Sequence, residues 1–234
     1  MRGLFVTGTD TGVGKTIVSA ALLAAMAAEG EPVRAHKPVM TGLDEQPDGD
    51  ADGAWPADHE LLGAAAGMAP DDVAPLRYGP AVSPDLAAAL AGERVEPARL
   101  LAAARAAGED ETLVVEGVGG LLSPLAADFT VCDLAAALAL PVLVAARPGL
   151  GTINHTLLTI RAARAARLDV RAVVLTPWPR GPSALERSNR EAIARMGTVD
   201  VAVLGRVGRP EPAVLAQAGA SLPWRDWLGE RPGP

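Results

Sequence analysis

Residues 8–16 of the chain read GTDTGVGKT, a glycine-rich stretch that ends in Gly-Lys-Thr. The stretch follows a short apolar run typical of a strand, at residues 2–7, and precedes an alanine-rich run typical of a helix, at about residues 15–29. A glycine turn in this position presents backbone N–H groups at a helix N-terminus, where the helix dipole favours anions. The pattern therefore predicts an α/β fold with a phosphate-binding loop after its first strand.

The residue types in this loop have separate tasks in phosphate binding. Gly12 and Gly14 let the backbone amides converge on a phosphate. Lys15 would reach the β- and γ-phosphates, and the Thr16 hydroxyl would bind Mg²⁺. The first glycine, Gly8, stands one place earlier than the common phosphate-loop spacing requires. The alternative is an ordinary connection between a strand and a helix, which the Gly-Lys-Thr ending disfavours.

Lysine is rare in this chain, so its positions are informative. The chain has 21 basic residues, and the only lysines are Lys15 and Lys37. Lysine brings a compact point charge to a phosphate, whereas arginine brings a wide planar fork. Lys37 ends a predicted strand at residues 32–37, at the sheet edge where ligands bind in open α/β folds, and Thr41 and Gly42 follow it. A solvated lysine at a strand end is the alternative.

Two carboxylates are candidates for a Mg²⁺ site beside the loop. Glu116 ends the apolar run at residues 112–116 and is followed by glycines. A carboxylate at that position beside a phosphate loop suits Mg²⁺. Asp58 opens a predicted helix, where it is either a second ligand or the helix N-cap. Competing carboxylates occur in the acidic, Gly/Pro-rich stretch just before it: Asp48, Asp50 and Asp52.

A second anion site is predicted at residues 149–160, which read GLGTINHTLLTI. A glycine turn opens a predicted helix there, and its free N-terminal amides suit a carboxylate. Asn154 and His155 could equally be ordinary helix-start residues. The three histidines of the chain, at unrelated positions, form no recognisable metal-binding pattern.

Short apolar runs alternate with helical ones along the chain. Strands are expected at residues 2–7, 32–37, 112–116, 141–146, 170–175 and 200–204. Helices are expected at about residues 15–29, 58–66, 84–91, 97–107, 130–139, 151–167, 183–195 and 212–218. Thr130 and Asp133 form a capping-box pattern at the start of one of them. The alternation predicts a P-loop NTPase-like fold, a mostly parallel sheet with helices on both faces, in a single domain over residues 1–234.

Charge and composition exclude several classes of function. The formal net charge of −7 is unfavourable for nucleic-acid binding, which depends on many Lys and Arg contacts to phosphates. The single cysteine, Cys132, excludes an intramolecular disulfide and a thiolate metal cluster. The apolar run at the N-terminus is too short for a secretory signal, so none is expected, and there is no stretch of about 20 apolar residues that could span a bilayer. We therefore expect a soluble cytoplasmic protein that binds neither nucleic acid nor membrane.

Several motifs together resemble those of the dethiobiotin synthetase family. In the family's order and approximate spacing, the chain contains GTDTGVGKT, HKPVMTG, VVEGVGGLLSPL, PVLVAARPGLGTINHTLLT and VLGRV. The resemblance covers residue 2 to about residue 208, and the tail beyond has no clear counterpart. The family's phosphate loop also places its first glycine one position early, as Gly8 is here, which accounts for the unusual spacing.

The resemblance implies a ligase that makes dethiobiotin from 7,8-diaminopelargonate (7,8-diaminononanoate), CO₂ and a nucleoside triphosphate with Mg²⁺. One substrate amine takes up CO₂ as a carbamate, and a carbamate oxygen attacks the γ-phosphorus to give a carbamic-phosphoric anhydride. The second amine then displaces phosphate and closes the ureido ring. The resemblance also implies a homodimer with the substrate at the interface.

Roles for individual residues follow from the same resemblance. Catalysis is assigned to Lys37, Lys15 and Thr11, and metal binding to Thr16, Asp58 and Glu116. Substrate binding is assigned to Lys37, Thr41, Gly117, Gly119, Gly120, Gly151, Thr152 and Asn154. Of these, Gly151, Thr152 and Asn154 would bind the substrate carboxylate from the neighbouring subunit. Nucleotide binding is assigned to Gly8, Gly12, Val13, Gly14, Lys15, Thr16, Ile17, Asp58, Glu116, Gly117, Val118, Gly119, Thr176, Pro177, Gly205, Arg206 and Val207.

The chain departs from the family pattern at two places. Gly12 stands where some members carry a glutamate, which removes one acidic contact near the phosphates. Thr176, Pro177 and Trp178 replace the asparagine that reads adenine in the family. We therefore expect weak selection for adenine, with ATP or another triphosphate such as CTP as the donor.

Two other functions remain open from the sequence. A nucleotide-switch ATPase of the partitioning or cell-division type typically has an additional lysine early in the loop, where this chain has Thr9 and Asp10. A cobyrinate-type amide synthetase shares the phosphate loop but needs a glutaminase domain with a nucleophilic cysteine and a histidine. Dependence of phosphate release on the diamine would distinguish these possibilities from the ligase.

Overall fold

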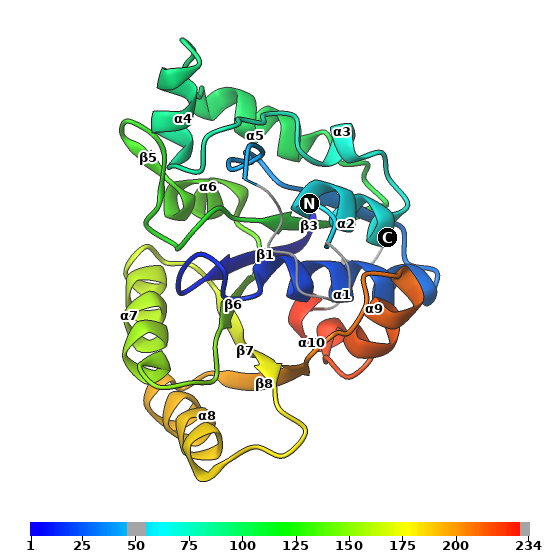
Figure 1. The fold of residues 1–234 in the computed structure, drawn as a ribbon, viewed down its shortest axis with the longest axis vertical. Coiled ribbons are helices and arrows are strands. Elements are labelled where there is room, and N and C mark those ends of the chain that lie inside the picture. The colour runs from blue at the N-terminus through cyan, green and yellow to red at the C-terminus, as the bar shows by residue number, and fades with distance from the viewer. Residues whose placement is uncertain (46–54, 230–234) are drawn as a thin grey trace.

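Six parallel strands form the central sheet of the computed structural model, which describes residues 1–45 and 55–229 (Figure 1). The strands are β1 (Arg2–Gly8), β2 (Val33–His36), β3 (Thr112–Glu116), β6 (Val142–Ala146), β7 (Val170–Trp178) and β8 (Asp200–Gly205). Their order across the sheet is β2-β3-β1-β6-β7-β8, and every neighbouring pair is parallel. The predicted fold class is confirmed, and each predicted strand is present within a few residues of its expected ends.

Helices cover both faces of this sheet (Figure 1). One face packs against α1 (Lys15–Ala28), α2 (Asp58–Ala66), α9 (Pro212–Gly219) and α10 (Trp224–Leu228). The other packs against α4 (Pro84–Leu90), α5 (Pro97–Arg105), α6 (Val131–Leu138), α7 (Thr152–Ala165) and α8 (Ala184–Gly197). Within residues 1–45 and 55–229, no helix combines the length and the apolar character needed to cross a membrane.

Burial on both faces explains why the strands are apolar throughout. In β1, Leu4 and Val6 belong to the core beneath α1, whereas Phe5 belongs to the core on the opposite face. All three side chains are fully buried. A strand in the middle of a parallel sheet has no solvent-facing side, so it shows no alternation of apolar and polar residues.

The capping box predicted at the start of α6 is present. The Asp133 amide donates to Thr130 Oγ1 at 3.3 Å, and the Thr130 amide donates to Asp133 Oδ2 at 2.8 Å. Four short elements were not predicted from the sequence: α3 (Pro70–Val73), α10, and an antiparallel pair formed by β4 (Pro124–Ala126) and β5 (Phe129–Thr130).

The segment after residue 208 is part of the core. α9 packs directly on α1, and a Cβ placed on Gly219 would lie 2.0 Å from the Ala21 carbonyl oxygen, so glycine is required there. The last helix, α10, buries Trp224 and Trp227 beneath the same face of the sheet. The guanidinium of Arg225 lies 4.2 Å from the centre of the Trp224 ring. The helix that follows the phosphate loop is therefore supported by the C-terminal part of the chain.

Candidate active site

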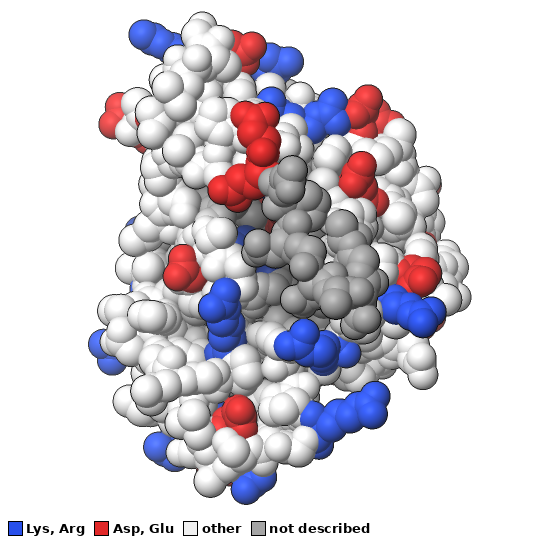
Figure 2. Space-filling model, viewed as in Figure 1, with Lys and Arg blue, Asp and Glu red and all other residues white. Residues whose placement is uncertain are grey.

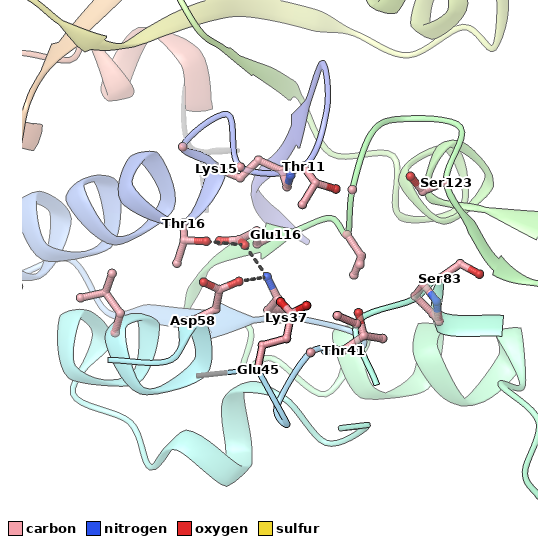
Figure 3. Close-up of a pocket in the computed structure, with 18 of the residues that line it drawn as sticks. Thr11, Lys15, Thr16, Lys37, Thr41, Glu45, Asp58, Ser83, Glu116 and Ser123 are labelled. Carbon is pink, nitrogen blue, oxygen red and sulfur yellow. Dashed lines mark hydrogen bonds and ion pairs between the residues drawn. The ribbon is translucent and has the colours of Figure 1, made fainter. Parts of the chain in front are cut away.

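The sheet order brings three segments that are distant in the sequence to one edge. β1 and β2 both pair with β3, so the carboxyl ends of these strands lie side by side. The phosphate loop, Lys37 and Glu116 follow or end those strands. Together with α2 and the segment before α4 they line a cavity of about 850 Å³ (Figure 3). This convergence agrees with the strand-end positions identified in the sequence.

Gly14 fixes the geometry of the phosphate loop at the start of α1. It caps the helix in the left-handed region, with φ of 93°. A Cβ on this residue would lie 2.6 Å from the Thr176 methyl carbon, so both the backbone angle and the contact require glycine. The leading amides of α1 have no acceptor within the helix and are available for an anion.

Lys15 lies in the first turn of α1 and folds back over the loop. Its Nζ donates to the carbonyl oxygen of Asp10 at 2.9 Å. Burial lowers the pKa of Lys15, an effect that the nearby Glu116 carboxylate partly offsets and the Lys37 charge reinforces. A phosphate in the loop would favour the charged form of this side chain.

Lys37 is the centre of a buried ionic cluster. Its Nζ lies 2.6 Å from Glu116 Oε1 and 2.5 Å from Asp58 Oδ2 (Figure 3). Lys37 is 5% exposed and Glu116 is 1% exposed, whereas the Asp58 side chain is 42% exposed. Burial by itself would lower the pKa of Lys37, but the two carboxylates outweigh it and raise this pKa above its ordinary value.

The same cluster keeps Asp58 ionised. Burial by itself would raise the pKa of Asp58, but the Lys37 ammonium outweighs this effect and lowers the pKa below its usual value. Asp58 is the first residue of α2, and the residue before it, Ala57, is the helix N-cap. The Asp58 side chain is thus turned to the cluster, and the alternative reading of this residue as the N-cap is wrong.

The three predicted metal ligands lie in this cluster. Thr16 Oγ1 donates to Glu116 Oε1 at 3.0 Å (Figure 3). The second carboxylate oxygen, Glu116 Oε2, is buried and has no hydrogen-bond partner among the described residues. A buried carboxylate oxygen without a donor suits a hard cation. The residues present therefore fit a magnesium ion.

Phosphate oxygens would complete such a site. Over residues 1–45 and 55–229, no group of three or more His, Cys, Asp or Glu side chains is arranged to hold a metal. Mg²⁺ in nucleotide sites is commonly held by one or two carboxylates together with phosphates and waters. The competing aspartates Asp48, Asp50 and Asp52 lie outside the described residues.

The far side of the cavity is lined by residues from three loops. Thr41 comes from the loop after β2, and Val118 and Gly119 from the loop after β3. Two serines that the sequence did not identify, Ser83 and Ser123, face the same cavity (Figure 3). Gly42, which the sequence placed beside Thr41, also lines the cavity. Further lining residues that the sequence did not identify are Glu45, Trp55, Pro56, Leu61, Ala81, Val82, Pro84 and Pro124. Ser83 directly precedes a helix that the sequence predicts, but nothing in the sequence around it indicates that it lines a cavity.

Many of the predicted site residues meet in this one cavity. Those that line it are Thr11, Gly12, Gly14, Lys15, Thr16, Ile17, Lys37, Thr41, Asp58, Glu116, Val118 and Gly119. Four others do not line the cavity but lie in the same loops or, for Gly8, at the end of the strand before one of them: Gly8, Val13, Gly117 and Gly120.

The remaining predicted residues lie elsewhere along the same sheet edge. Gly151, Thr152 and Asn154 are at the N-terminus of α7, after β6. Thr176 and Pro177 are near the end of β7, and Gly205, Arg206 and Val207 are at and after the end of β8. None of these residues lines the 850 Å³ cavity of their own chain.

A parallel sheet whose first strand leads through a Gly-Lys-Thr loop into a helix, with a buried lysine and carboxylates beside the loop, defines a P-loop nucleotide-binding protein. A family model described as an AAA domain matches residues 2–214. An ATP-dependent dethiobiotin synthetase of a Mycobacterium species is 40% identical, over 97% of this chain and 98% of that protein. The chain belongs to the family of ATP-dependent dethiobiotin synthetases, as the sequence motifs predicted.

Two further relatives carry the same name. The protein of Anaeromyxobacter dehalogenans is 48% identical over 75% of this chain and 76% of its own. That of Bacillus subtilis subsp. natto is 34% identical over 86% and 85%. Among solved structures, the cell division ATPase MinD of Pyrococcus furiosus matches with a TM-score of 0.56, over 95% of this chain and 97% of its own. At 20% identity, this likeness concerns the fold alone.

Proposed function

We propose that this chain is an ATP-dependent ligase that forms dethiobiotin from 7,8-diaminopelargonate and CO₂ in biotin biosynthesis, with residues 1–234 as one catalytic domain. The observation that carries the proposal is the meeting of Lys15 and Lys37 in one cavity. The reaction must bring a carbamate to a triphosphate, so two anions approach each other. Cations held on both sides of the contact offset that repulsion and align the attack.

The reaction is proposed to run in three steps. One substrate amine loses a proton and forms a C–N bond to CO₂, which gives the carbamate. A carbamate oxygen then forms a bond to the γ-phosphorus, and the bond from that phosphorus to the bridging oxygen of ADP breaks. In the last step the second amine attacks the carbamoyl carbon, loses a proton and releases phosphate as the ureido ring closes.

Lys37 would act through its charge in these steps. The two carboxylates raise its pKa, so the side chain stays an ammonium and cannot serve as a general base near neutral pH. It lies between the loop that would hold the triphosphate and the Thr41 side of the cavity (Figure 3). From there it would stabilise the negative charge that develops as the carbamate attacks.

The phosphate loop would hold and orient the triphosphate. Lys15 and the leading amides of α1 would bind the phosphates. Thr16, Asp58 and Glu116 would hold Mg²⁺, which when bound neutralises phosphate charge. Thr11 lines the cavity opposite Lys37 and would orient the carbamate through its hydroxyl (Figure 3).

The diamine would lie between the loops after β2 and β3. Thr41, Gly117, Gly119 and Gly120 are the proposed contacts on those loops. Ser83 and Ser123 line the same volume, and a serine hydroxyl can hydrogen-bond to an amine. A substrate with two amines requires several such contacts, because one amine must carry the carbamate while the other is held in position to close the ring.

A second copy of the chain would complete the substrate site. Gly151, Thr152 and Asn154 do not line the cavity of their own chain, yet they form a helix N-terminus suited to a carboxylate. Leu150, beside them, is 91% exposed, as an interface residue would be in a separated subunit. We therefore propose a homodimer in which α7 of one subunit binds the carboxylate in the site of its partner, acting in the cytoplasm.

The test is phosphate release measured with and without the diamine, with ATP, Mg²⁺ and CO₂ present throughout and dethiobiotin identified by mass spectrometry. Release that requires the diamine and matches the dethiobiotin formed supports the ligase. Equal release without the diamine would indicate a nucleotide switch instead. Release that depends on glutamine would indicate an amide synthetase.

A further inference from the structure

Arg147 joins the end of β6 to the phosphate loop. β6 pairs with β1 up to the partners Ala145 and Gly8, and the Thr9 amide donates to the Ala145 carbonyl oxygen at 3.1 Å. Arg147 is the residue directly after β6. Its exposed guanidinium donates two hydrogen bonds to the Gly12 carbonyl oxygen, from Nη2 at 2.9 Å and from Nε at 3.2 Å.

The bonded carbonyl belongs to the peptide that also supplies the Val13 amide. In a trans peptide the C=O and the following N–H lie in one plane and point in opposite directions. A cation that holds the Gly12 oxygen outward therefore aims the Val13 N–H to the opposite side. An ionised donor makes this a strong, directional contact.

Gly12 leaves the room that this contact needs. Its φ of 67° lies in the left-handed region, and a Cβ placed there would be 3.1 Å from Arg147 Nη2. A side chain at this position would press on the guanidinium. The contact made by Arg147 therefore depends on glycine at position 12.

The turn that contains Arg147 is also fixed from its other side. Asn189, a buried residue of α8, donates through Nδ2 to the carbonyl oxygens of Pro148 at 2.9 Å and Gly149 at 3.1 Å. Arg147 therefore extends to the loop from a turn that α8 holds in place. Because α8 holds this turn, Arg147 can restrict the movement of the phosphate loop rather than move with it.

We propose that Arg147 is a positioning residue for the triphosphate. It fixes the Gly12–Val13 peptide so that the Val13 amide is directed at the β-phosphate, and it adds a positive charge beside a loop in a chain of net charge −7. The role rests on the proposed nucleotide site and concerns binding and alignment of the phosphates. The diamine side of the cavity does not depend on it.

The experiment compares Arg147→Gln, Arg147→Lys and the control Arg164→Gln. Arg164 is also an exposed arginine that donates to two backbone carbonyls, at 2.6 Å to Gly197 and 2.9 Å to Thr198, between α7 and α8 and away from the loop. Dissociation constants for ATP, ADP and AMP are measured by calorimetry with Mg²⁺, together with the melting temperature and KM for the diamine at saturating ATP.

We expect Arg147→Gln to weaken ATP and ADP binding about tenfold, since a charge-assisted contact is lost. AMP binding and the diamine KM should change little, and Arg147→Lys should recover part of the loss because it keeps the charge. Arg164→Gln should bind all three nucleotides as the unchanged protein does.

Equal losses for ATP, ADP and AMP would overturn the proposal, because they would indicate general distortion of the site. Unchanged ATP affinity with a raised diamine KM would also overturn it, and would place Arg147 at the substrate. The dissociation constants of the nucleotides are measured without turnover, so they remain informative even if diamine-dependent phosphate release fails. If Arg147→Gln does not fold, Arg147→Lys carries the same comparison.

Discussion

Lys37 and Glu116 form a buried ion pair, with 2.6 Å between Nζ and Oε1, across the ends of two neighbouring strands. The lysine follows β2 and the glutamate ends β3, so the parallel register of these strands sets their separation. Each charge is expensive to bury alone. The pair therefore contributes both to the stability of the fold and to the chemistry of the site. Mutation can separate these two effects.

Lys37→Met should remove activity and also destabilise the fold, because it leaves the Glu116 carboxylate buried without its cation. We expect the free energy of unfolding to fall by about 3–5 kcal/mol and turnover to fall by about 10²–10³-fold. The double variant Lys37→Met/Glu116→Gln should recover most of the stability and none of the turnover. Urea unfolding and dethiobiotin formation measure the two effects, and recovery of turnover in the double variant would contradict the role of Lys37.

Glu116→Gln and Asp58→Asn should each raise the Mg²⁺ concentration needed for half-maximal activity. An amide is a neutral and poorer ligand for a hard cation than a carboxylate. The effect should be larger for Glu116, since its Oε2 is buried without a hydrogen-bond partner among the described residues. The control is Asp71→Asn, an exposed aspartate that pairs with Arg77 on the surface. A larger defect in Asp52→Asn would assign the second ligand to the acidic stretch before α2.

Mixing two inactive variants should restore activity if the substrate site is shared between subunits. Lys37→Ala removes the cation of a subunit's own cavity, and Asn154→Ala removes the carboxylate contact that the subunit gives to its partner. A mixed dimer contains one site in which both residues are intact. Activity is measured after subunit exchange, which labelled subunits verify. A mixture as inactive as its components would count against the shared site.

Selection for adenine should be weak. The Thr176 methyl carbon would lie 2.6 Å from a Cβ on Gly14, so this side chain packs against the phosphate loop. An asparagine matches two neighbouring atoms of adenine with a separate donor and acceptor, whereas one hydroxyl oxygen cannot span both atoms, and Pro177 has no amide proton. We expect competition binding with Mg²⁺ to give ATP and CTP affinities within about a hundredfold of each other. A preference for ATP over CTP, GTP and UTP beyond that range would contradict the expectation.

Stability should fall as the solution is acidified from pH 6.5 to about pH 4, because of His36. Burial lowers the pKa of this histidine from 6.5 to about 4, with a further contribution from Arg34. Between these values the unfolded chain binds more protons than the folded one, so acid favours unfolding by up to about 3 kcal/mol. Asp58, whose pKa is lowered from 3.8, contributes only at still lower pH.

Urea unfolding at pH 6.5 and at about pH 4 checks this expectation. His36→Leu should remove most of the difference between the two, and His155→Gln, at an exposed histidine, should leave it unchanged. An equal pH dependence in His36→Leu would assign the acid sensitivity to other groups.

Much of the fold and the inner part of the site could be predicted from the sequence because local patterns carry them. Lys37 and Glu116 each stand at the end of an apolar run, and parallel strands bring such ends to one edge. Ser83 and Ser123 could not be found in this way, because their position in the cavity depends on how separate loops pack. The same holds for Arg147 and Gly12, which are 135 residues apart and meet only because β6 pairs with β1.

α10 was missed for a related reason. It is a single short helix without a side-chain cap, and its residues are held by burial of Trp224 and Trp227 rather than by local helix signals. Propensity predicts such short segments poorly because tertiary packing decides their conformation.

The packing of α9 and α10 on α1 has a consequence for the order in which the protein matures. α1 begins at Lys15 and is made on the ribosome well before residues 212–228, which complete its surroundings. The helix that presents its amides to the triphosphate therefore reaches its final packing only after those residues have emerged. Nascent chains that stop short of them should be captured by chaperones rather than by nucleotide.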